Sequence, residues 1–64
     1  MSRFIVVQED EDVYNVFDRE EFDDKGYLNG YRNQEGYHIS DFDIIKEFNS
    51  FEKASDYAES LMYD

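Results

Sequence analysis

The chain has no cysteine, and its longest hydrophobic run is Phe4-Ile5-Val6-Val7. Without cysteine, neither disulfide bonds nor thiolate metal sites stabilise the fold, which fits a reducing compartment. The hydrophobic run is far shorter than the ~18 residues of a membrane span. The first residues also lack the long apolar stretch and cleavage site of a signal peptide. The sequence therefore indicates a soluble, cytoplasmic protein.

Residue types that carry out catalysis are scarce. His38 is the only histidine, and its place in an expected strand is typical of a structural or surface residue. The serines occupy no nucleophile motif, and the glycines lack the Gly-Lys-Ser/Thr ending of a phosphate-binding loop. An EF-hand loop requires glycine at its sixth position, but loops starting at Asp10 and Asp18 have Asn15 and Asp23 there. We therefore expect no enzyme, no cofactor and no dedicated metal site.

Positive charge is scarce as well. The 17 acidic residues outnumber 6 basic residues, which gives a formal net charge of −11. The basic residues are scattered singly, so the clustered positive surface that nucleic acids and anionic membranes require is missing. Self-repulsion opposes association between copies at low salt, although the sequence does not specify the oligomeric state. The electrostatic complement of this chain is a protein with a basic surface.

Aromatic residues are abundant and must supply most of the core. A chain of 64 residues forms one domain near the lower size limit for a hydrophobic core. Its 6 Phe and 6 Tyr make up 19% of the residues, and each such ring buries about 150–250 Å². High net charge is also typical of disorder, but the aromatic content and a periodic C-terminal half favour a folded domain over residues 1–64.

Short segments rich in β-branched and aromatic residues predict strands. These segments are residues 3–8, 13–17, 37–39 and 43–48. The four consecutive acids at 9–12 predict an exposed hairpin tip between the first two strands, because crowded carboxylates are costly in a core. A turn or bulge is expected at Ser40-Asp41. A helix capped by Ser40 is the alternative for residues 41–48.

The segment NSFEKASDYAESLMYD has helical periodicity. Either Asn49 or Ser50 is suited to be the N-cap, and Glu52 completes a capping-box spacing from Asn49. One apolar face is expected to consist of Phe51, Ala54, Tyr57, Ala58, Leu61 and Met62. Glu52, Asp56 and Glu59 form an acidic stripe away from that face. The predicted fold is α+β: a small antiparallel sheet of three or four strands with one C-terminal helix packed on one face.

Acidic residues form two clusters, one at the hairpin tip and one in the glycine- and tyrosine-bearing segment 18–36. The tyrosines in that segment either lie back on the sheet or act as contact residues. Same-face residues on a strand lie about 6.6–7 Å apart, a spacing of the same order as the ~3.4 Å between DNA phosphates along the helix axis. The candidate phosphate mimics are Asp10, Glu11, Asp12, Asp18, Glu20, Glu21, Asp23 and Asp24, with Tyr27 and Tyr31 as aromatic anchors and Glu52, Asp56 and Glu59 as second-rank contacts.

Two functional hypotheses follow from these features. The first is a small binding protein that inhibits a nucleic-acid-binding protein by DNA mimicry, with charge steering the encounter and aromatic residues anchoring it. Small acidic inhibitors of nucleic-acid enzymes, such as viral anti-defence proteins, share this physical description. The second is a non-catalytic accessory or adaptor protein, including one that self-associates, whose acidity serves only solubility. The sequence does not identify the partner.

Overall fold

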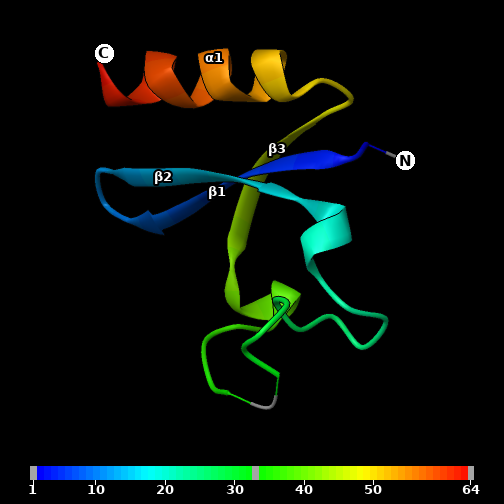
Figure 1. Cartoon of the computed structure of the whole chain (residues 1–64). Coiled ribbons are helices and arrows are strands. Elements are labelled where there is room, and N and C mark those ends of the chain that lie inside the picture. The colour runs from blue at the N-terminus through cyan, green and yellow to red at the C-terminus, as the bar shows by residue number, and fades with distance from the viewer. Residues whose placement is uncertain (1, 33, 64) are drawn as a thin grey trace.

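A three-stranded antiparallel sheet carries one helix on one face in the computed structural model, which describes residues 2–32 and 34–63 (Figure 1). The elements are β1 (Phe4–Asp10), β2 (Val13–Asp18), β3 (Asp43–Phe48) and α1 (Phe51–Met62). Two short 3-10 helices, η1 (Arg19–Glu21) and η2 (Ile39–Asp41), lie between β2 and β3. The predicted small α+β fold with a C-terminal helix is confirmed.

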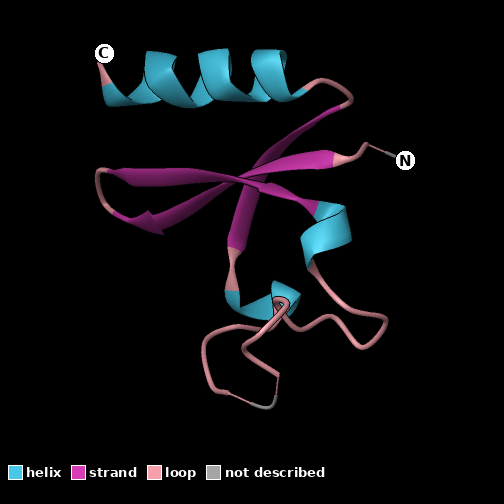
Figure 2. Cartoon of the chain, in the orientation of Figure 1, coloured by secondary structure: helices cyan, strands magenta, loops and turns pink. Residues whose placement is uncertain are grey.

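The strand order β2-β1-β3 explains the long segment between β2 and β3. Both outer strands are antiparallel to β1 and therefore parallel to each other, so the chain has to cross from one end of the sheet to the other. Residues 19–42 make this crossing as a mostly irregular layer, drawn below the sheet in Figures 1 and 2. It leaves β2 at the base end, where Phe4 lies opposite Asp18, and enters β3 at the tip end, where Gln8 lies opposite Asp43.

The core on the helix side of the sheet is small. Val6, Ala54 and Ala58 are buried together, and the alanines let the helix backbone approach the strand closely. Half-buried side chains surround them: Phe4, Tyr14, Val16, Ile45, Phe48 and Tyr57. The helix therefore packs through small residues in its middle, with aromatic rings closing the sides.

The opposite face of the sheet is covered by an aromatic cluster. Ile5 and Val7 are fully buried, and alternation along β1 directs them away from the helix. Phe17, paired with Ile5 across the strands, shares this face and packs against Phe22 and Phe42, with ring centroids 5.1 to 6.0 Å apart. The crossing segment is thus the second cover of the sheet, and β1 is buried from both sides.

One sequence prediction for this region is wrong and another is confirmed. Residues 37–39 do not form a strand: His38 makes one isolated bridge with Tyr27, and η2 starts immediately afterwards. The reason is local capping, because the His38 ring accepts a hydrogen bond from the backbone N–H of Ser40 while the Asp41 carboxylate accepts one from the N–H of His38. The strand predicted for residues 43–48 is confirmed, because β3 forms there and pairs with β1, and the alternative helix capped by Ser40 does not form.

The hairpin turn is shorter than expected. β1 continues through Glu9 to Asp10, which pairs with Val13, so only Glu11 and Asp12 form the turn. A register shift between Gln8 and Asp10 marks a β-bulge at Glu9.

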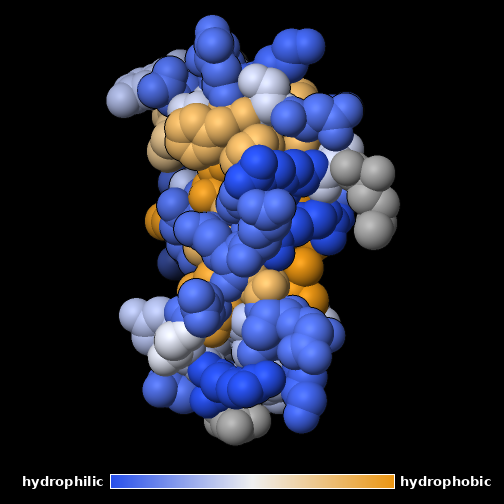
Figure 3. Space-filling model, turned by 45° about the vertical axis from the view of Figure 1, so that its right-hand side comes forward, coloured by the Kyte–Doolittle hydropathy of each residue, from blue (hydrophilic) through white to orange (hydrophobic). Residues whose placement is uncertain are grey.

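Helix α1 agrees with the prediction in its centre and differs at its ends. Ser50 is the N-cap, and its hydroxyl accepts a hydrogen bond from the N–H of Lys53. Phe51 and Met62, predicted to be buried, are 58% and 47% exposed, because they lie in the first and last turns, beyond the alanines that contact the sheet. Figure 3 shows hydrophobic surface left open beneath the hydrophilic outer side of the helix.

Candidate partner-binding surfaces

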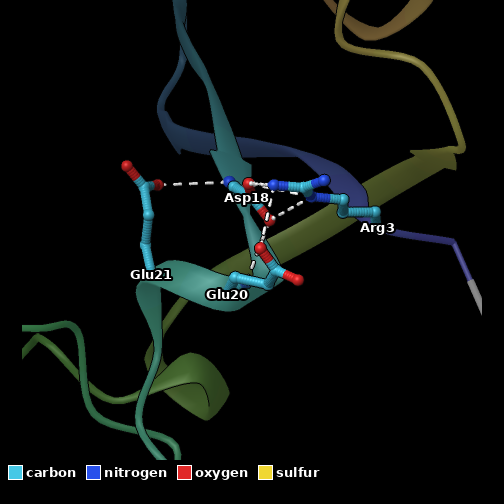
Figure 4. A network of polar contacts seen from close by, with 4 residues as sticks. All are labelled: Arg3, Asp18, Glu20 and Glu21. Carbon is cyan, nitrogen blue, oxygen red and sulfur yellow. Dashed lines mark hydrogen bonds and ion pairs between the residues drawn. The ribbon is translucent and has the colours of Figure 1, made fainter.

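At the base end of the sheet, acidic side chains are engaged by one arginine (Figure 4). Nε and Nη2 of Arg3 donate to the Asp18 carboxylate at 2.8 to 3.1 Å, and Nη2 pairs with Glu20 at 2.8 Å. Asp18 also caps η1 by accepting from the N–H of Glu20, while Glu21 accepts from the N–H of Asp18 at 3.1 Å. These three acids hold the start of the crossing segment in place.

A second arginine engages the next pair of acids. Arg32 lies 3.1 Å from Asp23 and 3.7 Å from Asp24. The Asp23 carboxylate also accepts hydrogen bonds from the N–H groups of Lys25 and Tyr27, at 2.9 and 3.0 Å. Asp23 therefore organises a turn of the crossing segment as well as carrying charge.

These contacts shift the pKa values of the groups involved. The side-chain hydrogen bond from Arg3, followed by the backbone hydrogen bond from Glu20, lowers the pKa of Asp18 below its ordinary value of 3.8, and the Asp18 contact raises the pKa of Arg3. The backbone hydrogen bond from Tyr27 is the largest cause that lowers the pKa of Asp23 below 3.8. Both carboxylates thus stabilise the folded state in their charged form.

A non-monotonic dependence of stability on pH is expected. As pH falls from neutral towards the isoelectric point near 4.2, net charge and self-repulsion decrease, so the thermal midpoint should rise. Below the ordinary aspartate pKa of 3.8, the stabilisation from Asp18 and Asp23 is lost as pH approaches their lowered folded-state pKa values, so the midpoint should fall. Circular dichroism melts across this range measure both effects.

The double variant Asp18→Asn/Asp23→Asn is the control for this pH profile. It should melt at a lower temperature at neutral pH and should lose the steep decline in acid. A parent midpoint that falls continuously from neutral pH would contradict the opposing repulsion effect.

The tip end carries a different arrangement of acids, which we call the tip surface. It consists of Glu9, Asp10, Glu11, Asp12, Glu35, Asp41 and Asp43, all of them exposed. Glu9, Asp41 and Asp43 line one surface hollow together, and Asp41 and Glu35 line a neighbouring one. Within residues 2–32 and 34–63, the ion pairs involve Arg3, Arg19 and Arg32 and none of these seven carboxylates.

Aromatic residues adjoin the tip surface. Tyr27 and His38 line the hollow that contains Glu35 and Asp41. Their rings meet edge to face with centroids 4.8 Å apart. Tyr31, which is 41% exposed, stacks on Tyr37 with centroids 4.1 Å apart. The two tyrosines predicted as anchors are therefore held by other rings, which reduces the entropy they would lose on binding.

His38 fixes the backbone beneath this hollow. Its Nδ1 accepts from the N–H of Ser40, so the ring proton lies on Nε2, which donates to the carbonyl of Lys25 at 2.8 Å. Gly26 lies directly against this ring with φ +91°, and a Cβ there would come within 2.8 Å of Nε2. The histidine is thus a structural residue that joins Lys25 to the 3-10 helix η2 within the crossing segment.

The predicted contact residues lie on three separate surfaces. Asp10, Glu11 and Asp12 belong to the tip surface, whereas Asp18 to Asp24 lie towards the base end, where Arg3 and Arg32 engage most of them. The acidic stripe on α1 is exposed. No acid lies between the ends of the hairpin along β2, because Val13–Phe17 is VYNVF. The acids therefore do not form one continuous track along this strand.

Sequence reasoning missed three acids of the tip surface, and it placed Glu9 in the hairpin tip without naming it as a phosphate mimic. Asp41 and Asp43 join the tip because β3 pairs with β1 and Gln8 lies opposite Asp43, and Glu35 shares a hollow with Asp41. The charge pattern holds no signal for this pairing of β1 with β3.

The fold and its surfaces define a small acidic α+β domain. Comparison of the chain with protein-family models, curated proteins and solved structures found no match in any of the three. Within the described residues, no group of three or more His, Cys, Asp or Glu side chains is arranged to hold a metal ion. No helix of the described chain is long and apolar enough to cross a membrane.

Proposed function

We propose that this chain is a small, non-catalytic binding protein that inhibits a nucleic-acid-binding protein by presenting its tip surface in place of DNA phosphates. The observation that carries the proposal is the segregation of charge. Arg3, Arg19 and Arg32 pair with acids outside the tip surface, and the seven tip carboxylates take no part in those ion pairs. A basic groove would meet concentrated negative charge at this end.

The rigidity of the scaffold supports mimicry over a flexible acidic tail. Six of the seven tip carboxylates come from a hairpin, the start of β3 and a capped 3-10 helix, and backbone hydrogen bonds fix all three elements. Glu9 and Asp10 are further held by hydrogen bonds from Asn15 and from the N–H of Glu11. Charges held in place lose little conformational entropy when they bind, so more of the electrostatic attraction appears as affinity.

Neutralising the tip should weaken binding to a basic partner. The variant Glu9→Gln/Asp10→Asn/Glu11→Gln/Asp12→Asn keeps the side-chain shapes and the acceptor oxygens. Exposed ion pairs contribute about 0.2–1 kcal/mol each, so the loss of four should lower affinity by about four-fold to several hundred-fold. The experiment is affinity purification of the partner from host extract on immobilised protein, with duplex DNA as the competing eluent, followed by titration of the purified partner.

The matched control is Glu20→Gln/Glu21→Gln/Asp24→Asn/Glu47→Gln, which removes the same formal charge away from the tip. It should retain most of the affinity. A partner that DNA does not release, or an affinity unchanged from low to high salt, would rule out mimicry and would favour an ordinary adaptor. Equal losses in the two variants would show that net charge matters and that the tip surface has no special role.

A further inference from the structure

An apolar groove runs between α1 and β2, and its lining residue Asn15 contacts Glu9 of the tip surface. Its lining includes Tyr14, Val16, Phe51, Ala58, Met62 and Glu59. Phe51 and Met62 are the two large apolar side chains that the helix leaves exposed, and Val13 at the start of β2 is 46% exposed. Such a surface costs solubility in a monomer, so it indicates contact with another molecule.

The groove has an acidic wall along the helix. At about 100° per residue, Phe51, Ser55 and Met62 point in nearly one direction. Viewed down the helix axis, the next side chains towards solvent are Glu52, Asp56 and Glu59. The nearby cation Lys53 points about 180° away from Met62, so it does not offset this negative charge at the groove. At its other wall, Asn15 donates to the carboxylate of Glu9. An apolar floor between negative walls is complementary to a segment that alternates apolar and basic side chains.

The floor of the groove includes the free edge of β2. Tyr14, Asn15 and Val16 are consecutive lining residues, so both sides of the strand and its outer edge contribute. β2 pairs only with β1, which leaves its outward N–H and C=O groups without a strand partner in the described chain. A free edge of this kind accepts an extended segment by backbone hydrogen bonding, with pockets selecting alternate side chains.

We infer that the β2–α1 groove binds an extended basic segment of the partner protein as an added strand. The apolar side chains of that segment would lie against Phe51 and Met62, and its Lys or Arg side chains would project from the opposite face of the added strand, beside Asn15 and Glu9. The acidic stripe of α1 would add electrostatic attraction from the helix side. The inference rests on the proposed function for the sign of the partner's charge. It assigns the predicted second-rank residues Glu52, Asp56 and Glu59 to a different contact from the tip surface.

A second copy of the chain is a poorer occupant. Each copy carries −11 net charge, and pairing β2 with β2 would bring the acidic stripes of two helices to one interface. Like charges at such an interface repel each other and would restrict any dimer to high salt. The groove therefore fits a basic segment better than it fits itself.

Two peptides of identical composition test this inference. KVKVKVK alternates apolar and basic side chains, whereas KKVVVKK has the same residues without alternation; both are acetylated and amidated. Titration into the ¹⁵N-labelled protein should shift the amide resonances of residues 13–17 and 51–62 for the alternating peptide. The alternating peptide should bind about five-fold or more tightly than the block peptide, because only alternation places all its valines on the groove side.

The variants Met62→Ser and Phe51→Ser should each weaken the alternating peptide and leave the block peptide unchanged. Met62→Ser is the safer variant, because Phe51 also contacts the ring of Phe4, and melting curves verify that both remain folded. Equal affinities, with shifts confined to the tip surface, would overturn the groove and leave the proposed function standing. Binding of neither peptide at low salt would count against both, and a dimer paired through β2 would overturn the choice of occupant.

Discussion

Replacing Ala54 with either glutamate or lysine is expected to unfold the protein. Ala54 is fully buried against Val6 and next to Ala58, at the closest approach of α1 to the sheet. A longer side chain overpacks this contact by about 1–3 kcal/mol, and an unpaired buried charge costs several more. A domain of 64 residues has only about 3–10 kcal/mol of stability to lose. Circular dichroism and urea titration should show no cooperative transition.

The two opposite charges separate packing from electrostatics. Lysine reduces the net charge of −11 and relieves self-repulsion, so unfolding by Ala54→Lys can only come from the buried contact. Ser60 is exposed on the same helix and supplies the controls. Ser60→Lys should be neutral or slightly stabilising, and Ser60→Glu slightly destabilising, each by less than about 1 kcal/mol. An Ala54→Lys variant that melts like the parent would contradict the packing of α1.

Most of the fold was predictable because local patterns specify it. Short segments rich in β-branched and aromatic residues predict β1 and β2. The small residues at helical spacing predict the face of α1 that packs on the sheet. The run Phe4-Ile5-Val6-Val7 is also apolar without a break, which the alternating pattern of a half-buried strand would not require. Three consecutive residues of it are fully buried, which is typical of a strand covered on both faces. The second cover, formed by the crossing segment, was therefore implied by the sequence although its conformation was not.

The geometry of the binding surfaces was harder to predict, because it depends on tertiary pairing. The acidic residues at 18–24 are Asp and Glu, as at the hairpin tip, yet most of them form ion pairs with Arg3 or Arg32. Arg32 follows Asp23 through an irregular loop whose path no periodicity specifies. Likewise, Phe51 and Met62 have the correct helical phase for the core, but only Ala54 and Ala58 in the middle of the helix are buried against the sheet. Helical phase predicts the direction in which a side chain points, but its burial also requires a part of the sheet that reaches it.

Phe42→Ala should destabilise the protein by about 2–3 kcal/mol and open the crossing segment. Phe42 joins the end of η2 to the sheet, with its ring centroid 5.1 Å from that of Phe17 and 6.0 Å from that of Phe22. Deleting a large aromatic side chain removes apolar burial and leaves a cavity; a fully buried phenylalanine costs about 3–5 kcal/mol and a half-buried one less. Urea titration measures the loss of stability.

Hydrogen exchange shows whether this loss is local. The N–H of Leu28 donates to Tyr37 and that of Ile39 to Gly26, so both amides report on the crossing segment alone. Both should exchange faster in Phe42→Ala, and Glu35 and Asp41 should then lose their fixed positions beside the hairpin tip. Phe51→Ala is the matched control: the same deletion at a 58% exposed ring should cost less than about 1 kcal/mol and leave these amides protected. If the segment stays protected in Phe42→Ala, it does not depend on the aromatic cluster, and the tip surface has another support.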